Sequence, residues 1–305
     1  MALTTIGFVG FGEAGFHVAR GLLGAGVPRI AAYDIHTDTP GRGELIRQRA
    51  VEAGVRLAES SRGLARSCDL LISTVTANSA LEAAEETAPY LGARHLYADF
   101  NSVAPATKQT IDAVVRRAGA RFVEGAIMSP VPPHGHRVPI LLGGAGAGDF
   151  AEAMSRWGMR LERLGDDVGT AAAVKMFRSI VVKGLEALLF ECVLGASRYG
   201  AEKRVFDSLA GSFPGIDWDR LANYMVGRVV VHGERRAREM DEVARTLRSL
   251  GIEPMMAEAT ARRQDWAAGL DLRTVFGSEG PSGYAEVVRA IEERGGGSRG
   301  AHRAF

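Results

Sequence analysis

The chain has 305 residues, of which 46% are hydrophobic and 24% are charged, and its formal net charge is +1 at pH 7. This balance is typical of a globular protein long enough for two domains, and the absence of basic runs interleaved with aromatic residues argues against a nucleic-acid partner. No apolar stretch approaches the length needed to cross a bilayer, so no membrane partner is expected.

Short β-rich runs alternate with helical patterns through the first half of the sequence. The predicted strands are 6–9, 29–33, 69–74, 95–100, 121–125 and 139–144. This alternation predicts an α/β fold with an N-terminal Rossmann-type, doubly wound and mostly parallel sheet. The strand pattern stops near Gly165, and a long apolar run over 171–199 begins a helical remainder. We therefore expect an NAD(P)-binding domain over 1–166, an all-α substrate and dimerisation domain over 167–293, and a flexible tail over 294–305.

The first predicted strand runs into a glycine-rich loop and then directly into a helix. In a dinucleotide-binding loop the first glycine permits a tight turn, the second lets a pyrophosphate approach the backbone, and the third lets the helix pack on the strand. The expected cofactor-binding residues of this loop are Gly10, Gly12, Glu13, Ala14 and Gly15.

Asp34 ends the second predicted strand. At that place an acidic side chain accepts hydrogen bonds from the adenosine ribose hydroxyls and repels a 2′-phosphate, which favours NAD over NADP. A helix-capping or turn role is the simpler alternative for an aspartate. His36 and Arg42 follow closely and are able to contact a phosphate, so NADP stays open.

Polar residues also follow two later strands. Asn101 and Ser102 offer amide and hydroxyl donors to a substrate carboxylate, although both residue types are also common helix caps. Ser129 begins a proline-rich loop and is expected to line the pocket as a donor. His134 and His136 in the same loop have no further ligand at matching spacing, so a metal is not expected.

The order and spacing of these motifs resemble those of a known family. The glycine loop, the DxNSxxP segment, the SPV loop followed by PILLGG, and Gly169 six residues ahead of Lys175 are similar to the β-hydroxyacid dehydrogenases and 6-phosphogluconate dehydrogenase. The resemblance covers about the first 200 residues. The helical half looks like a bacterial branch whose C-terminal domain is described only as phosphogluconate-dehydrogenase-like.

The resemblance implies roles for individual residues. Val75 and Thr76 would line the ribose side of the cofactor, and Lys175 would be the catalytic lysine. Asn101, Ser102 and Ser129 would face the substrate. Relatives pair through the helical domain, so a homodimer is implied as well.

Departures from the family pattern bear on the substrate. The family usually carries asparagine four residues after the lysine, whereas this chain has Ser179, preceded by Arg178. We expect both residues to contact the substrate and to change the set of donors around it. Val182 stands where phosphogluconate-type enzymes carry a glutamate, which argues against 6-phosphogluconate decarboxylation.

Lysine is rare in this chain. The four lysines are Lys108, Lys175, Lys183 and Lys203, and every other basic side chain apart from histidine is arginine. Oxidising an alcohol by hydride loss needs a group that takes the hydroxyl proton, and a desolvated lysine can do this whereas arginine cannot. We therefore assign that role to Lys175 and expect Lys183 to pair with Glu186 on the same helix. For His232 and Arg236, a solvated or interface position and an anion clamp for the substrate both stay open.

The sequence predicts an NAD(P)-dependent oxidoreductase that transfers a hydride between nicotinamide and the alcohol carbon of a small hydroxy acid. The alternatives are a ketone or imine reductase of the same fold and a non-catalytic dinucleotide-binding protein. The run over 171–199 is too apolar around its circumference for a helix with one solvated face, which predicts a central helix and supports the homodimer. Cys68 and Cys192 lack metal or redox spacing, and the N-terminal segment predicts a strand rather than a signal peptide. A cytoplasmic location is expected.

Overall fold

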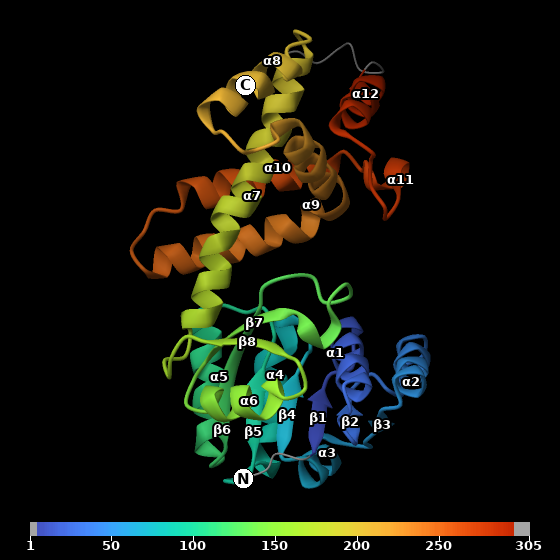
Figure 1. Ribbon diagram of the computed structural model, residues 1–305, viewed down its shortest axis with the longest axis vertical. Coiled ribbons are helices and arrows are strands. Elements are labelled where there is room, and N and C mark those ends of the chain that lie inside the picture. Colours follow the sequence, from blue (N-terminus) through green and yellow to red (C-terminus); the bar gives the residue numbers. More distant parts are fainter. Residues whose placement is uncertain (1–4, 296–305) are drawn as a thin grey trace. The chain divides into compact units, whose positions relative to one another are not determined.

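The computed structural model describes residues 5–295 and divides into two compact units, Met1–Lys175 and Met176–Phe305 (Figure 1). The division falls inside a long helix, whereas the sequence predicts a boundary after residue 166, ahead of that helix. Of the predicted tail, residues 296–305 lie outside the described residues, and its first two positions are the end of the last helix.

The N-terminal unit is an α/β domain built on one sheet. Its strands are β1 (Ile6–Val9), β2 (Ile30–Tyr33), β3 (Arg56–Leu57), β4 (Leu70–Ser73), β5 (Leu96–Asp99), β6 (Arg121–Ile127), β7 (Pro139–Gly143) and β8 (Arg160–Arg163). Its helices are α1 (Glu13–Gly24), α2 (Arg42–Ala53), α3 (Ser61–Ser67), α4 (Ala80–Thr87), α5 (Pro105–Arg117) and α6 (Ala147–Ser155), with short 3₁₀ turns η1 (Ala77–Ser79), η2 (Ala88–Tyr90) and η3 (Gly135–Arg137).

The strand order is β3-β2-β1-β4-β5-β6-β7-β8. Neighbouring strands run parallel except β6 and β7, which are antiparallel. The prediction of a doubly wound, mostly parallel sheet is confirmed. Because β1, β4, β5 and β6 are parallel neighbours, their carboxyl ends meet at one edge, where ligands bind in open α/β sheets.

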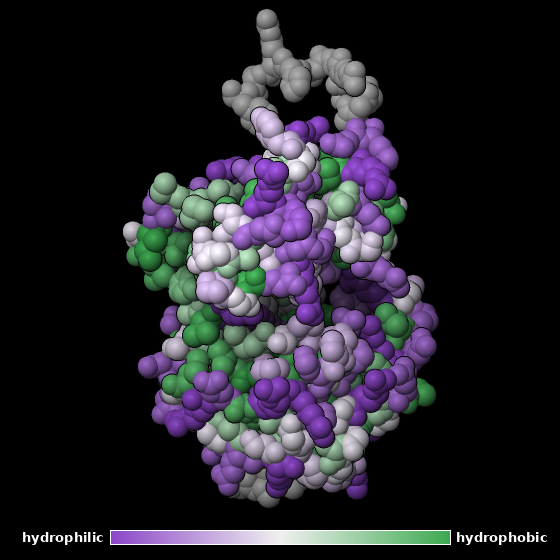
Figure 2. All heavy atoms as spheres, turned by 45° about the horizontal axis from the view of Figure 1, so that its top comes forward, coloured by the Kyte–Doolittle hydropathy of each residue, from purple (hydrophilic) through white to green (hydrophobic). Residues whose placement is uncertain are grey.

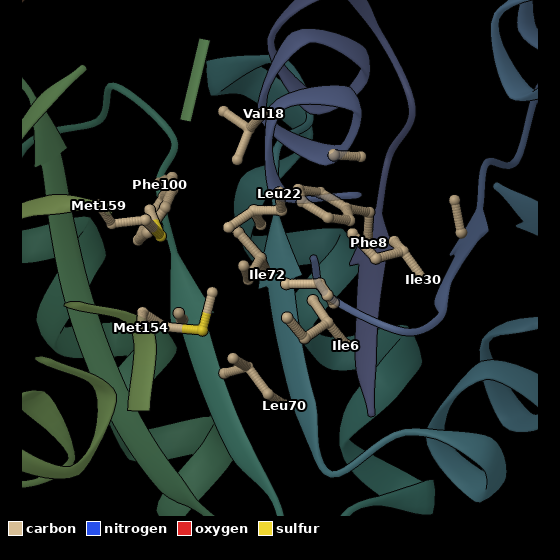
Figure 3. Close-up of a cluster of buried hydrophobic side chains, with 14 of the residues drawn as sticks. Ile6, Phe8, Val18, Leu22, Ile30, Leu70, Ile72, Phe100, Met154 and Met159 are labelled. Atoms are coloured by element: carbon tan, nitrogen blue, oxygen red, sulfur yellow. The ribbon is translucent and has the colours of Figure 1, made fainter. Parts of the chain in front are cut away.

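Side chains along each strand point alternately to the two faces of the sheet, and they pack into one hydrophobic layer on each face. Ile6 and Phe8 of β1 pack with Leu22 of α1, and Figure 3 shows these side chains converging with residues of β2 and β4. Helices α1, α2 and α6 contribute to this layer. Val9 of β1 belongs to the opposite layer, with side chains of α3, α4 and α5 such as Ile111. Burial on both faces explains why the strands read as continuous apolar runs.

The six predicted strands all occur, and two further strands were missed. Strand β3 has two residues, too few for a period to show. Strand β8 has the sequence RLER and lies at the edge of the sheet with mostly exposed side chains, so it carries no apolar signal.

The C-terminal unit is helical in its described part. Its helices are α7 (Thr170–Ser197, which begins in the N-terminal unit), α8 (Glu202–Ser212), α9 (Trp218–Ser249), α10 (Met255–Gly269), α11 (Arg273–Phe276) and α12 (Tyr284–Gly295). Asp217 caps α9 by accepting a hydrogen bond from the Arg220 amide at 3.0 Å. Phe190 of α7 and Val229 of α9 lie in a core shared with α10 and α12. The predicted all-α character of this unit is confirmed.

Polar side chains cover much of the face shown in Figure 2, and apolar side chains gather at its left edge. Among the described helices, none is both long and apolar enough to cross a membrane.

Candidate cofactor and substrate site

The glycine loop joins β1 to α1 at the carboxyl edge of the sheet. Gly10 has a φ of +84°, and a Cβ at this position would lie 2.6 Å from Cγ1 of Val75, so a side chain is excluded. A Cβ on Gly15 would lie 2.7 Å from Oγ1 of Thr74, which shows how closely α1 approaches the end of β4. A Cβ on Gly12 would meet no atom of the described chain within 4 Å. The loop is therefore closed at its first and third glycines and open at the second.

Helix α1 presents its first turn beside this open position. Glu13, Ala14 and Gly15 form that turn, and the N-cap Gly12 has no side chain to cap it. Backbone amides in the first turn of a helix have no intrahelical acceptor, and the helix dipole favours an anion there. The loop residues predicted to bind the cofactor thus lie together, and their geometry fits a pyrophosphate.

The carboxylate of Asp34 connects the glycine loop to the loop after β2. Its Oδ2 accepts a hydrogen bond from the Phe11 amide at 2.7 Å, and its Oδ1 accepts one from the His36 amide at 2.9 Å. A carboxylate has about four acceptor positions, so two bonds leave acceptor capacity for ribose hydroxyls. Arg42 Nη1 lies 3.4 Å from His36 Nε2, and both side chains are exposed. A basic pair therefore lies in the same loop region as the acidic group.

The residues after β4 lie against the glycine loop. Thr74 donates its hydroxyl to the Gly10 carbonyl at 2.9 Å, and Val75 is the nearest neighbour of the position where a Gly10 side chain would be. Thr76 is exposed, and its Oγ1 lies 3.0 Å from Ser79 Oγ at the start of the next helical segment. Val75 thus contacts the loop directly, while Thr76 lies one residue further along at the surface.

The polar residues after β5 form a buried network. Asn101 is 4% exposed, and its Nδ2 donates to Asp99 Oδ2 at 2.7 Å and to Ser73 Oγ at 2.9 Å. Asp99 also forms a buried ion pair with Lys108 of α5. Ser102, the next residue along the chain, is exposed.

The sequence motifs predict no role for Lys108. This residue is 1% exposed and shares the buried face of α5 with Ile111 and Val115. Lys108 precedes Ile111 by three residues and Val115 by seven, which puts it on the same helical face. This spacing was the available signal, because a lysine among core residues requires a buried partner. Asp99, at the end of the preceding strand, is that partner.

Glu124 of β6 was also missed. It is fully buried, and its carboxylate accepts hydrogen bonds from the amides of Gly169 and Ala172, each at 2.7 Å. These amides belong to the start of α7, so Glu124 caps this helix and lies favourably in its dipole. A charged residue in the middle of an apolar strand was the only sign of this role.

Lys175 lies half-buried in the second turn of α7, three residues beyond the capped Ala172. Arg178, which is exposed, and Ser179, which is half-buried, follow on the next turn and belong to the C-terminal unit. Ser129 is half-buried and comes two residues after the end of β6, at the same sheet edge as the residues after β5.

The loop that carries Ser129 packs back against α1. His136 is 8% exposed, and the position where Gly21 of α1 would carry a side chain is filled by its ring. Burial, with the charge of Arg137 in addition, lowers the pKa of His136, while His134 is exposed. Within residues 5–295, no group of three or more His, Cys, Asp and Glu side chains is arranged to hold a metal ion.

The charged residues of the C-terminal unit correct one local prediction. Lys183 pairs with Glu239 of α9 at 2.9 Å and not with Glu186 of its own helix. Glu186, which is fully buried, instead pairs with Arg236 and lies 3.4 Å from Arg228 Nε. Burial raises the pKa of Glu186, and the two arginines oppose that shift. The expected pairing was wrong because both side chains turn toward α9.

His232 and Arg236 lie on α9, and the sequence leaves open a solvated or interface position and an anion clamp for the substrate. Arg236 is 4% exposed and its charge is already matched by Glu186. Burial, followed by the charges of Arg235 and Arg228, lowers the pKa of His232 to about 4. This lowered pKa favours the neutral imidazole at pH 7, and Glu186 already engages the charge of Arg236, so these contacts do not support the anion clamp.

Two family models match the chain. Residues 5–131 match the NAD binding domain of 6-phosphogluconate dehydrogenase, and residues 196–267 match a domain of unknown function, DUF1932. The first match confirms the predicted nicotinamide dinucleotide cofactor.

Solved structures resemble the chain over nearly its whole length. A conserved hypothetical protein from Sinorhizobium meliloti 1021 is 37% identical with a TM-score of 0.80, over 96% of this chain and 97% of that one. The conserved protein MTH1747, described as structurally similar to 3-hydroxyacid dehydrogenases, is 31% identical with a TM-score of 0.75, over 87% and 97% of the two chains. A Mycobacterium tuberculosis 3-hydroxyisobutyrate dehydrogenase is similar in fold, with a TM-score of 0.69 at 16% identity, over 95% and 99%.

Proposed function

We propose that this protein oxidises a small hydroxy acid with NAD. The chain belongs to a 3-hydroxyacid dehydrogenase-like family, and its NAD-binding domain matches that of 6-phosphogluconate dehydrogenase. One observation carries the proposal. Lys175 lies on a helix whose first turn is fixed by Glu124, and Glu124 belongs to the sheet whose carboxyl edge carries the open glycine loop. A titratable amine and a dinucleotide cradle are thus parts of one unit.

The proposed reaction needs a hydride acceptor and a proton acceptor. Bound NAD supplies the nicotinamide ring that takes the hydride. Lys175, as the neutral amine, takes the hydroxyl proton while the carbon–hydrogen bond breaks, its electron pair leaves with the hydride, and the carbonyl double bond forms. In the reverse direction the Lys175 ammonium returns the proton to the oxygen.

The remaining predicted residues would bind and orient the substrate. Ser102 and Ser129 offer hydroxyl donors at the sheet edge. Arg178 suits a substrate carboxylate, since a guanidinium donates two parallel hydrogen bonds. Ser179 lies one helical turn beyond Lys175 on α7 and would contact the same substrate. Asp34 would accept the adenosine ribose hydroxyls and disfavour a 2′-phosphate.

A cofactor-linked panel tests this function. The protein is mixed with NAD and a set of small hydroxy acids, and with NADH and the matching oxo acids, with and without an amine, while the absorbance of reduced nicotinamide is followed. We expect turnover with at least one hydroxy acid. Turnover only with ketone plus amine would identify a reductase of imines, and NADH binding without any turnover would identify a non-catalytic binding protein. Either result would overturn the proposal.

We also propose that the protein is a homodimer formed through the helical unit. Val181 and Leu188, two turns apart on α7, are 70% and 58% exposed. Leu250 and Met255, where α9 turns into α10, are 58% and 69% exposed, and apolar colour gathers at the left edge of Figure 2. Light scattering at micromolar concentration should give twice the chain mass. Leu188→Glu should shift the measured mass toward that of the monomer, and a monomeric parent protein would contradict the proposal.

A cytoplasmic location is the last part of the proposal. Cys68 and Cys192 are both free thiols, and burial raises the pKa of each, which disfavours the reactive thiolate. Unpaired and unreactive cysteines are usual in a reducing compartment. Cell fractionation with a protein-specific antibody would check the location.

A further inference from the structure

Lys108 has an unusual position for a lysine. It projects from α5 among apolar residues and is 1% exposed, although it takes no part in the proposed hydride or proton transfer. A buried ammonium is costly unless all of its donors are bonded and its charge is matched. Its contacts therefore indicate what the position is used for.

Every donor of the Lys108 ammonium has an acceptor at the end of β5 or in β6. Its Nζ donates to Oδ1 of Asp99 in a short contact, to the Asp99 carbonyl at 2.7 Å and to the Gly125 carbonyl at 3.3 Å. The other carboxylate oxygen, Oδ2 of Asp99, accepts from Asn101 Nδ2 at 2.7 Å, and Oδ1 also accepts from the Asn101 amide at 3.2 Å. Lys108 thus holds Asp99, and Asp99 holds Asn101.

These bonds fix which way the Asn101 amide points. Both hydrogens of Nδ2 are used, one by Asp99 and one by Ser73 Oγ at 2.9 Å. Exchanging the amide oxygen and nitrogen would bring an oxygen against the Asp99 carboxylate, which is repulsive. Oδ1 of Asn101 is left buried with no hydrogen-bond partner among residues 5–295. A buried acceptor in this condition is destabilising unless something donates to it.

We propose that Lys108 is a positioning residue which, through Asp99, turns Asn101 so that Oδ1 accepts a hydrogen bond from a ligand. This rests on the proposed function, and it reverses the donor role that the sequence predicts for Asn101. A substrate carboxylate cannot bind Oδ1, because both are acceptors. The reacting hydroxyl has one hydrogen, which goes to Lys175. The ligand group is therefore another N–H or O–H, either on the nicotinamide half of the cofactor or on a second hydroxyl of the substrate.

Variants of the network separate positioning from folding. Asn101→Ala removes the acceptor and keeps the Asp99–Lys108 ion pair. Asp99→Asn combined with Lys108→Met removes both buried charges together, so no unpaired charge is left, and Asn101 is then free to turn. Lys203→Met is the matched control, since the Lys203 side chain is 86% exposed and pairs with Asp207 one turn away on α8.

The first measurement is NADH binding to each variant by titration calorimetry, which needs no turnover. If the cofactor donates to Oδ1, we expect Asn101→Ala and the charge-free double variant each to weaken NADH by about tenfold, the upper range for one neutral hydrogen bond. Lys203→Met should bind as the parent does. Adding Asn101→Ala to the double variant should then cause little further loss, because both changes remove the same bond. If Lys108 had a purely structural role, the losses of NADH affinity caused by Asn101→Ala and by the double variant would add in the combined variant.

The second measurement compares glycerate with 3-hydroxypropanoate, which lacks the second hydroxyl, at saturating NADH. If the substrate donates, the parent protein binds glycerate more tightly, and this preference disappears in the same variants while NADH affinity stays constant. Unchanged NADH affinity together with an unchanged acid preference would overturn the inference. Absence of turnover with every acid would overturn the proposed function alone, since the NADH titration would still report on Asn101.

Discussion

The two units use their charged side chains differently. In the sheet unit, Asp34 and Glu124 accept hydrogen bonds from backbone amides, and thereby fix the glycine loop and the first turn of α7. In the helical unit, Glu186 and Arg236 bond to each other across α7 and α9. Charged side chains hold the backbone around a site in the first unit, where the buried Asp99–Lys108 pair also joins α5 to the end of β5. In the second unit the buried pair holds one helix against another. Substitutions in the first unit should therefore affect cofactor binding or turnover, whereas substitutions of the buried pair in the second unit should lower the unfolding free energy.

The helical pairs also fix a register. Lys183 faces Glu239 and Glu186 faces Arg236, so two ion pairs of opposite sense match α7 with α9 in antiparallel order. Sliding α9 by one turn would bring Lys183 toward Arg236, a like-charge contact. Buried ionic groups that specify register in this way need not add net stability.

The buried Glu186–Arg236 pair should be the position most sensitive to substitution. Arg236→Met leaves the fully buried Glu186 without its main partner, which should cost about 3–5 kcal/mol of unfolding free energy. Glu186→Gln combined with Arg236→Met should recover much of this loss, because no unpaired charge stays buried. Urea unfolding followed by circular dichroism measures both. NADH affinity should not change. A selective loss of NADH binding in a folded Arg236→Met protein would show that this pair supports the cofactor site and not only the packing of α7 on α9.

Interactions between residues close together in the sequence were easier to predict than interactions between distant residues, and the two units differ in this respect. The sheet core, the glycine loop and the polar strand ends were predicted because strand, loop and helix are consecutive, so their residues meet within one local pattern. The Asp99–Lys108 pair was within the same reach, nine residues apart, yet was missed because the register of Lys108 with Ile111 was not used. Glu186 and Arg236 are fifty residues apart, and no local spacing on α7 indicates which helix it will face.

The second prediction tests Lys175 against Lys183, one lysine from each unit. Lys175→Arg keeps the positive charge but cannot exchange a proton, so turnover should fall by roughly 100-fold or more while NADH affinity stays nearly constant. Lys183→Arg should change little, because arginine preserves the ion pair with Glu239. Steady-state rates with any accepted substrate and an NADH titration decide it. Similar activity in both variants would mean that the proton acceptor is another group.

The third prediction concerns the acidic end of β2. NADH should stabilise the parent protein against heat more than NADPH does, because the Asp34 carboxylate repels a 2′-phosphate. Asp34→Asn keeps an oxygen that can accept from the Phe11 amide but removes the charge, and it should reduce the NADH preference by about tenfold in the ratio of dissociation constants. Asp34→Ala loses the loop bond too, and should weaken both cofactors. A parent protein that prefers NADPH would contradict the assignment and direct attention to His36 and Arg42.

The smallest effect returns to the helical unit and its pH dependence. Burial, with Arg235, Arg228, Arg236 and Arg273 in addition, lowers the pKa of His232 to about 4, below the ordinary value of 6.5. Between these values the unfolded chain binds a proton that the folded chain does not, so this residue makes the unfolding free energy rise as the pH rises from about 4 to about 6.5. Above pH 7 the residue is neutral in both states and adds no further slope.

His232→Gln should remove that contribution and narrow the difference in urea-unfolding free energy between pH 5 and pH 7. Carboxylates titrate in the same window, but they are common to both proteins and cancel when the parent and the variant are compared. Because His232 is partly exposed, solvent screening reduces the change, which is why we rank it last. NADH affinity should be the same in both proteins, since the histidine lies in the unit whose charges hold helices. An equal pH dependence in parent and variant would show that burial and the surrounding arginines do not hold His232 neutral. A change in NADH affinity alone would show that the charges of the helical unit serve the cofactor as well.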